Sequence, residues 1–225
     1  ATLNLSSLDG SNGFRLEGEG FPESTRLGSS VSSAGDINGD GFDDVIVSAA
    51  DGRYDSQISF VLFGKASGFE ATLNVSNLDG LNGFRIGSAE YGYSYPGGSV
   101  SNAGDVNGDG FDDLIVGAPQ ADSKYGTDTG FSYVVFGKAS GFEAVMNVSD
   151  LDGRNGFRLH GAQAYDFSGR SVSSAGDVNG DGFDDLLVGA PAADSNGENS
   201  GSSYVIFGRS DFGGGQLPTI PGTPN

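Results

Sequence analysis

The chain has 225 residues, of which 40 are glycine, 30 are acidic and 11 are basic, so its formal net charge at pH 7 is -19. This charge argues against nucleic acid or an anionic membrane as a partner, because either would require a basic face. The absence of cysteine and the single histidine argue against thiol chemistry, a multi-histidine metal site and a Ser-His-Asp triad.

Three sequence blocks recur in the same order along the chain, which identifies internal repeats. The first is a decapeptide that begins at Gly35, Gly104 and Gly176. The second begins at Leu8, Leu78 and Leu151. The third is an apolar strand that ends in Phe-Gly: Phe60–Gly64, Tyr133–Gly137 and Tyr204–Gly208. Recurrence of all three blocks indicates one structural unit repeated three times.

Each unit contains four predicted β-strands, because short β-branched and aromatic runs alternate with glycine and proline. The strands of the second unit are Ser99–Ala103, Asp113–Val116, Phe131–Phe136 and a fourth that recurs as Gly83–Ile86 and Gly156–Leu159. No helical period persists along the chain. Four antiparallel strands in each repeat predict an all-β fold made of propeller blades, ahead of a sandwich.

The order of the blocks predicts how the blades close into a ring. The chain opens with a fourth strand, within Leu3–Leu16, and its repeats end on a third strand, Tyr204–Gly208. We therefore expect the strand around Phe14 to complete the C-terminal blade and hide its edge. Propellers have about four to eight blades, so three blades predict a homodimer that forms a six-bladed ring. The alternative is a piece of a longer propeller.

The repeats predict two segments of different character. Residues 1–211 form the three blades, and residues 212–225 match no part of the repeat. Glycine, proline and threonine dominate this second segment, which is typical of a flexible tail or linker. The chain has no apolar run of the roughly 18 residues that a membrane-spanning helix requires.

The decapeptide places oxygen-bearing side chains at the first, third, fifth and ninth positions of a tight loop. Calcium takes six to eight oxygen ligands at about 2.3–2.6 Å, and a glycine at the sixth position lets the seventh backbone carbonyl turn toward the ion. The predicted Ca²⁺ ligands, three sites per chain, are Asp36, Asn38, Asp40, Phe42 and Asp44, then Asp105, Asn107, Asp109, Phe111 and Asp113, then Asp177, Asn179, Asp181, Phe183 and Asp185.

Two other interpretations of the decapeptide are an EF-hand and a plain hairpin turn. An EF-hand would need a glutamate at the twelfth position and flanking helices, but Val47 stands there inside a predicted strand. A plain hairpin turn would not need three carboxylates whose mutual repulsion is costly without a cation. A strand–loop–strand calcium site is therefore favoured. The eighth-position residues Asp43, Asp112 and Asp184 are expected to point away from the ion, either solvated or hydrogen-bonded.

The Phe136-Gly137 pair, the Gly-Ala-Pro turns at Gly117–Pro119 and Gly189–Pro191, and the intervening loop resemble the FG-GAP repeat. That repeat builds the β-propeller of integrin α subunits and of related bacterial surface proteins. The resemblance implies propeller blades, calcium in the loop between the first two strands, and an extracellular adhesion role. The chain departs from it at Val47–Ala50, which lacks Gly-Ala-Pro, and in having three repeats where the integrin propeller has seven blades.

A ligand surface is predicted opposite the calcium loops, where the loops joining strands two to three and four to one differ between units. A constant scaffold with variable loops on one rim is a common way to present a binding surface. The aromatic residues proposed for it are Tyr54, Tyr91, Tyr93, Tyr95, Tyr125, Tyr165 and Phe167. Drift in unconstrained loops, with some aromatics filling the centre, explains them equally well.

The favoured function is a calcium-stabilised, non-catalytic module at the cell surface or outside the cell, used for adhesion or for binding a protein or glycan. One alternative is a carbohydrate-active enzyme or its accessory domain, which needs two carboxylates facing each other about 5–9.5 Å apart. A second alternative is an engineered repeat scaffold, because Phe136–Asn147 nearly duplicates Phe63–Asn74. His160 stands where its sister units have Glu17 and Gly87, so we expect a surface loop residue there.

Overall fold

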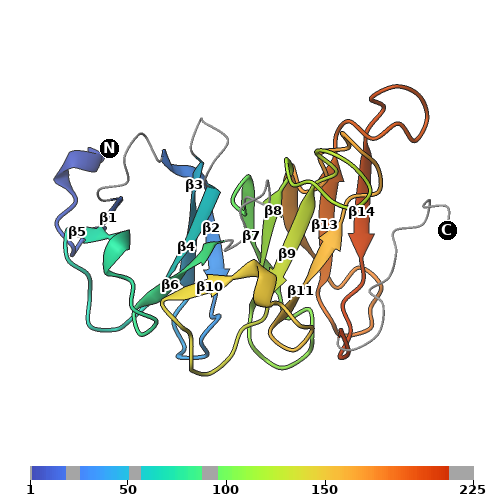
Figure 1. Cartoon of the computed structure of the whole chain (residues 1–225). Coiled ribbons are helices and arrows are strands. Elements are labelled where there is room, and N and C mark those ends of the chain that lie inside the picture. Colours follow the sequence, from blue (N-terminus) through green and yellow to red (C-terminus); the bar gives the residue numbers. More distant parts are fainter. Residues whose placement is uncertain (1, 19–25, 51–56, 88–95, 213–225) are drawn as a thin grey trace.

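A computed structural model of the chain describes residues 2–18, 26–50, 57–87 and 96–212. Within these ranges the elements are β-strands and three single-turn 3₁₀ helices, with no α-helix. The sheets stand side by side in chain order, from the N-terminal end to the C-terminal end (Figure 1). The prediction of an all-β fold is confirmed. The described residues do not form a closed ring.

The first two units form the predicted four-stranded antiparallel blades. The first blade, in order of position, contains β2 (Leu27–Gly35), β3 (Asp44–Ala50), β4 (Gln57–Leu62) and β6 (Gly83–Gly87). The second contains β7 (Ser99–Gly104), β8 (Asp113–Ala118), β9 (Phe131–Val135) and β11 (Gly156–His160). Each predicted strand of the second blade agrees with its observed counterpart to within two residues.

The third blade contains three strands: β12 (Ser171–Gly176), β13 (Asp185–Ala190) and β14 (Ser202–Ile206). Within one chain, the N-terminal strand β1 (Arg15–Glu17) does not pair with this blade, so its predicted role in completing a C-terminal blade stays a prediction. Strand β1 pairs in parallel with β5 (Thr72–Asn74). The reason is spatial, because β1 and β14 lie at opposite ends of the row of sheets (Figure 1).

A backward link joins the second blade to the first. The segment between the third and fourth strands of the second blade contains β10 (Val145–Asn147), which pairs in parallel with β6 of the first blade. The pairing of β5 with β1 is the same link one repeat earlier. A 3₁₀ turn directly follows each of these linking strands: η2 (Val75–Asn77) follows β5, and η3 (Val148–Asp150) follows β10. The equivalent turn near the N-terminus is η1 (Leu5–Ser7). These short strands were not predicted from the sequence.

Stacked phenylalanines reinforce the link at every repeat. Phe142 lies on Phe84 of the preceding blade with ring centroids 4.8 Å apart and planes at 9°. Phe212 lies on Phe157 in the same way, at 4.2 Å and 7°. Phe212 is buried and packs as part of the third repeat, whereas the sequence predicted that the tail or linker begins at this residue. The earlier pair, Phe69 on Phe14, stacks at 4.4 Å.

The hydrophobic core lies between adjacent sheets. Between the first and second blades, Ile37 and Ile46 pack in one cluster with Leu114 and Val116, all without solvent exposure. Between the second and third blades, the equivalent cluster includes Val106 and residues of β13. No described helix is long and apolar enough to cross a membrane.

Candidate metal centre

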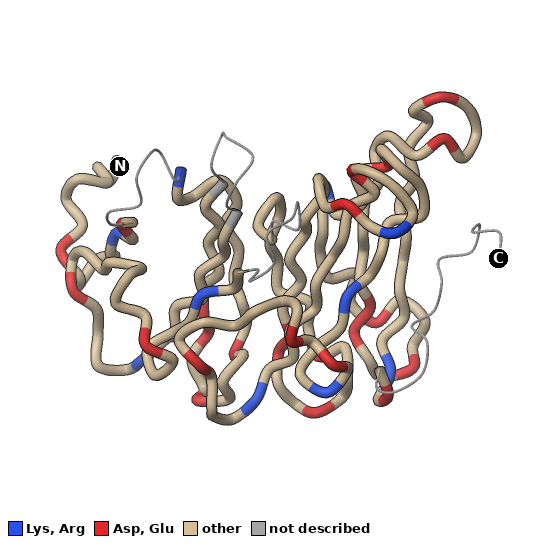
Figure 2. The backbone as a smooth tube through the Cα atoms, viewed as in Figure 1, with Lys and Arg blue, Asp and Glu red and all other residues tan. Residues whose placement is uncertain are grey.

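The three decapeptides form the loops that follow β2, β7 and β12, and they lie along one rim of the molecule. Acidic residues gather on this lower rim in the view of Figure 2. A β-bulge just before each loop ends the pairing of the first two strands, for example between Ser33 and Gly35. Positive φ angles at Gly39 (71°) and Gly41 (89°) then turn the backbone sharply, a conformation that favours glycine.

Within the first loop, side-chain oxygens accept backbone N–H groups of the same turn. The two carboxylate oxygens of Asp36 accept the N–H groups of Asp40 and Gly41 at 3.0 and 2.9 Å. Asn38 Oδ1 accepts Asp40 N–H at 2.9 Å, and Asp40 Oδ1 accepts Phe42 N–H at 2.9 Å. The second and third loops repeat these bonds. The side-chain oxygens of the first, third and fifth positions are thereby held on one short turn.

The ninth-position aspartate is buried and joins the loop to the blade. Asp113 has no exposed surface and accepts the N–H groups of Val106 at 3.0 Å and Gly137 at 2.9 Å. Asp44 and Asp185 make the equivalent bonds in their own repeats. The glycine of the Phe-Gly pair is needed here, because a Cβ on Gly137 would meet the backbone oxygen of Asp112.

Burial in the absence of a positive partner makes these carboxylates electrostatically costly. The pKa of Asp44 is raised to about 6 and that of Asp113 to about 8, chiefly by desolvation and to a smaller extent by the neighbouring loop carboxylates. No lysine or arginine in the described part of the chain forms an ion pair with a loop carboxylate. A buried, unpaired carboxylate is normally neutralised or bound to a cation.

The donor set of each loop fits a hard divalent cation such as calcium. It consists of carboxylate and amide oxygens, together with the backbone carbonyl of the seventh residue, and calcium prefers oxygen ligands of this kind. The described residues do not bring three or more carboxylate or histidine side chains together at metal-binding distances. In the loops as described, the donors are engaged with backbone N–H groups and with each other, as in the 3.0 Å bond from Asn38 Nδ2 to Asp40 Oδ2.

The eighth-position aspartates connect one loop to the next. Asp112 Oδ2 accepts the backbone N–H of Asp36 at 2.8 Å, and Asp184 Oδ2 accepts that of Asp105 at 2.9 Å. Asp43, at the start of the row, is exposed and accepts no hydrogen bond among the described residues. From the sequence, these aspartates were expected to be either solvated or hydrogen-bonded, and both situations occur.

The predicted ligand surface is described in part. Tyr54, Tyr91, Tyr93 and Tyr95 lie outside the described residues. Tyr125 and Tyr165 are exposed, whereas Phe167 is half-buried. Tyr165, Phe167 and the neighbouring Asp128 all have positive φ angles (66°, 51° and 50°), which is strained for residues with a side chain.

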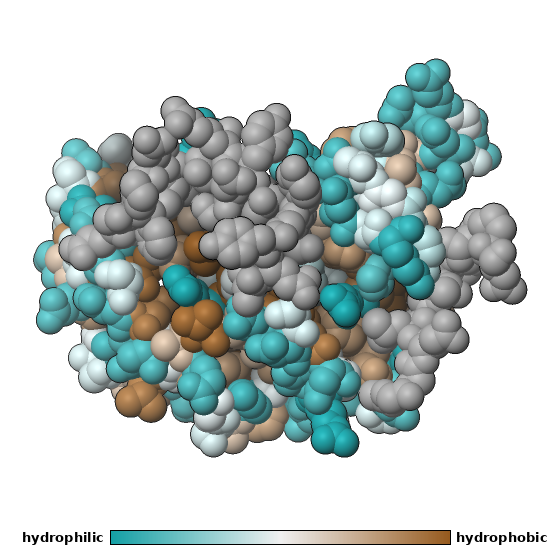
Figure 3. Space-filling view, viewed as in Figure 1, coloured by the Kyte–Doolittle hydropathy of each residue, from teal (hydrophilic) through white to brown (hydrophobic). Residues whose placement is uncertain are grey.

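Other features of this rim bear on ligand binding. Segment 165–168 donates backbone hydrogen bonds to segment 127–129, so loops of adjacent blades are tied together. His160 ends β11, is half-buried and lies edge-on to Phe131, rather than on a surface loop as expected. Burial lowers the pKa of His160. The loop that joins β13 to β14 projects beyond the sheets and is largely hydrophilic (Figure 3).

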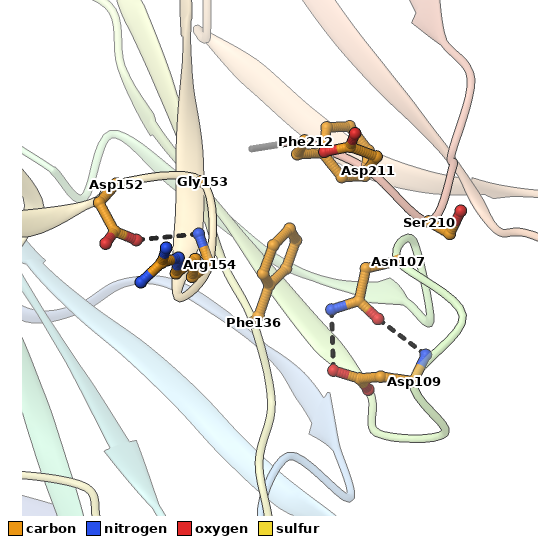
Figure 4. A pocket seen from close by; sticks show the side chains of 9 residues that line it. All are labelled: Asn107, Asp109, Phe136, Asp152, Gly153, Arg154, Ser210, Asp211 and Phe212. Atoms are coloured by element: carbon orange, nitrogen blue, oxygen red, sulfur yellow. Dashed lines mark hydrogen bonds between the residues drawn. The ribbon is translucent and has the colours of Figure 1, made fainter. Parts of the chain in front are cut away.

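An open cavity of about 750 Å³ lies beside the second loop (Figure 4). Asn107 and Asp109 of that loop lie on one side of it, and Asp152 and Arg154 on the other. Phe136, Gly153, Ser210, Asp211 and Phe212 complete its lining. The carboxylate side chains of this cavity are exposed, whereas the general acid of a glycosidase is typically buried so that it stays protonated.

Residues 27–62, 96–135 and 168–206 match the FG-GAP repeat family. The chain belongs to the FG-GAP repeat family. These FG-GAP repeats contain the first three strands of each blade and the loop between the first two. The resemblance inferred from the motifs is confirmed, and the chain is an integrin α-like β-propeller repeat module.

Curated relatives of the FG-GAP chain include integrins and an enzyme. It is 32% identical to integrin alpha-PS5 of Drosophila melanogaster over 166 residues, which is 72% of this chain and 15% of that protein. It is 33% identical to integrin alpha pat-2 of Caenorhabditis elegans over 83% of the chain and 14% of the relative. Phosphatidylinositol-glycan-specific phospholipase D of Bos taurus is 30% identical over 84% of the chain and 21% of the enzyme. The chain thus spans less than a quarter of each of these relatives.

Proposed function

We propose that the chain is a calcium-binding, non-catalytic β-propeller module, located outside the cell or at its surface, that takes part in adhesion. The observation that carries the calcium assignment is the threefold recurrence of a fully or almost fully buried aspartate beside an Asp-x-Asn-x-Asp-Gly turn. Calcium would neutralise these carboxylates and fix the loops. The adhesion role and the location draw support from the integrin relatives.

In the proposed centres, the ion is held by the aspartate, asparagine and aspartate side chains of the turn, by the seventh backbone carbonyl and by the buried aspartate. In the second loop these are Asp105, Asn107, Asp109, the Phe111 carbonyl and Asp113. Binding requires the turn side chains to exchange some backbone N–H partners for the ion. The buried aspartate keeps its two backbone N–H bonds, so it positions the ion relative to the blade.

We further propose that a second copy of the chain completes the ring, giving six blades in a homodimer. Three blades account for only part of a propeller, since propellers contain about four to eight. Exposed Tyr125 and Tyr165, together with the strained backbone of their rim, form the proposed contact surface for a protein or glycan. Tyrosines supply large rigid contact areas at low entropic cost, which suits recognition of either ligand.

Calcium stoichiometry by isothermal titration tests the metal assignment. We expect three ions for each unmodified chain and two for the Asp109→Ala variant, because this change removes a donor from the second loop only. Asp150→Ala is the matched control, since Asp150 is an exposed aspartate outside the loops. Three ions in the Asp109→Ala variant, or none in the unmodified chain, would refute the assignment.

A carbohydrate-active enzyme is the second candidate, favoured by the 750 Å³ cavity with Asp109, Asp152 and Asp211 in its lining. The test is release of reducing sugars from a panel of glycans. Activity that disappears in Asp152→Asn and remains in Asp150→Asn would establish this function in place of the non-catalytic one.

A further inference from the structure

The first blade exposes a surface that the other two blades bury. Val31 of β2 is 66% exposed, whereas the equivalent residues Val100 and Val172 are 5% and 6% exposed. Phe42 is 42% exposed, whereas its equivalents in the other loops are half-buried. In the second and third blades this surface packs against the preceding blade, whereas among the described residues no blade lies against it in the first blade.

The third blade exposes the opposite surface. Val178 is 60% exposed, whereas Ile37 and Val106 in the same position are completely buried. Along the sheet, Leu187, Val205 and Phe207 are 38%, 47% and 53% exposed. Their equivalents in the second blade, Ile115, Val134 and Phe136, are all buried. The two ends of the row therefore display the two halves of a contact that occurs twice inside the molecule.

The polar part of this contact is open at both ends as well. Between neighbouring blades, the eighth-position carboxylate fits against the glycine that precedes the adjacent loop: a Cβ on Gly35 would collide with Asp112, and one on Gly104 with Asp184. Nothing lies within 4 Å of a Cβ on Gly176. Among the described residues, the backbone N–H of Asp177 has no hydrogen-bond acceptor, and no N–H group donates to the carboxylate of Asp43.

The strand edges are complementary in the same sense. In the first two blades the fourth strand pairs with the third, for example with Phe157 opposite Val134 and Arg158 opposite Tyr133. In the described part of the chain, β14 has no strand on this edge, and β1 pairs on one side only, with β5. The repeat register would place Phe14 opposite Val205 and Arg15 opposite Tyr204.

We propose that the first-blade end of one copy docks on the third-blade end of a second copy, with Asp43 bound to the backbone N–H of Asp177 and β1 added to β14. This inference rests on the proposed ring of two chains and specifies its contact. The occupant is a second copy because each chain carries both halves of the contact. Two such contacts, related by a twofold axis, would pair the exposed first-blade and third-blade ends of both copies and close a ring.

Docking also completes the third calcium loop. Asp112 and Asp184 fix the first residue of the first and second loops from the neighbouring blade. The third loop receives this bond only from Asp43 of the second copy. Calcium binding at the third loop and dimer formation therefore strengthen each other to the same degree, as linkage requires.

Cross-linking between cysteines tests the predicted register, and the chain has no native cysteine to interfere. The double variant Arg15→Cys/Tyr204→Cys, treated with a short bis-maleimide, is expected to give a covalent species of twice the 22.9 kDa chain mass. Each single variant is the control and is expected to stay uncross-linked. Failure of the double variant to cross-link overturns the proposed contact, and a ladder of larger species overturns its twofold closure.

Light scattering of the charge-reversed variant Asp43→Arg tests the polar bond. We expect the dissociation constant of the dimer to rise at least about tenfold, since a charge-assisted bond is replaced by an unpaired charge. Asp150→Arg, an equal charge change elsewhere, is expected to remain dimeric.

Calcium titration of the Asp43→Arg monomer separates the two proposals. The coupling is supported if the first two loops keep their calcium affinity and the third loop binds calcium more weakly. It is refuted if all three loops bind calcium with equal affinity. Absence of calcium binding in a chain that still cross-links would refute the calcium proposal alone.

Discussion

Asp112 Oδ2 accepts the backbone N–H of Asp36 at 2.8 Å, across 76 positions of sequence. This bond joins the second decapeptide loop to the start of the first, and Asp184 makes the same bond to Asp105. The loops on this rim are therefore connected in series, and each one depends on the blade that follows it.

Replacing Asp112 by alanine is expected to lower the free energy of unfolding by about 1–2 kcal/mol, because the N–H of Asp36 loses a charged acceptor at a partly buried site. Urea denaturation at a protein concentration where the chain is monomeric gives this quantity. Asp43→Ala is the matched control at the same motif position, and we expect no change under those conditions. An equal loss in both variants would contradict the inter-blade role of Asp112.

Removal of calcium is expected to lower the melting temperature, since the uncompensated loop carboxylates then repel each other. With free calcium about 100-fold above the dissociation constant, each site contributes about 2.7 kcal/mol. Scanning calorimetry with calcium, with excess chelator and with calcium restored measures the effect. Magnesium is expected to restore less stability than calcium, because it prefers a stricter octahedral geometry. A melting curve unaffected by chelator is inconsistent with the proposal.

Asp113→Ala is expected to destabilise the chain by about 2–4 kcal/mol even in chelator, because the buried N–H groups of Val106 and Gly137 lose their acceptor. Chemical denaturation without calcium isolates this structural part of the effect. Asp150→Ala serves as the exposed control. If Asp113→Ala changed stability only when calcium was present, the carboxylate would serve the ion alone.

Phe142→Ala is expected to cost about 3–5 kcal/mol, since it removes a buried ring stacked on Phe84 between two blades. Phe69→Ala removes the equivalent ring at the N-terminal end, where Phe69 is half-buried, and is expected to cost less. Thermal denaturation of the two variants side by side gives the comparison. Equal costs would show that the stack contributes little beyond local packing.

The local parts of the fold were predictable from the sequence. Strands such as Asp113–Ala118 combine β-branched residues with glycine-rich boundaries, and the decapeptide turn carries its own side-chain hydrogen bonds. The relations between repeats were less accessible. Strand β10 has three residues and pairs in parallel with a different blade, so no local pattern marks it.

Two further residues show what the sequence could have signalled. Residues 212–225 match no part of the repeat by sequence, so a tail was predicted from Phe212 onward, yet the Phe212 ring packs as that of Phe142 does. The third repeat is one residue shorter between Phe-Gly and this phenylalanine than the other two. The eighth-position aspartate recurs in all three repeats, which was a signal of function. Its acceptor role depends on a bulge and a glycine in another blade, which only the three-dimensional structure displays.

The backward link between blades has an evolutionary consequence. A gene segment that encodes one repeat contributes a sheet and also the strand and phenylalanine that fasten it to the previous sheet, as β10 and Phe142 do. Duplication or deletion of such a segment therefore adds or removes a sheet together with the contacts that join it to the previous sheet. A lineage can change the number of blades in this architecture without having to invent a new junction.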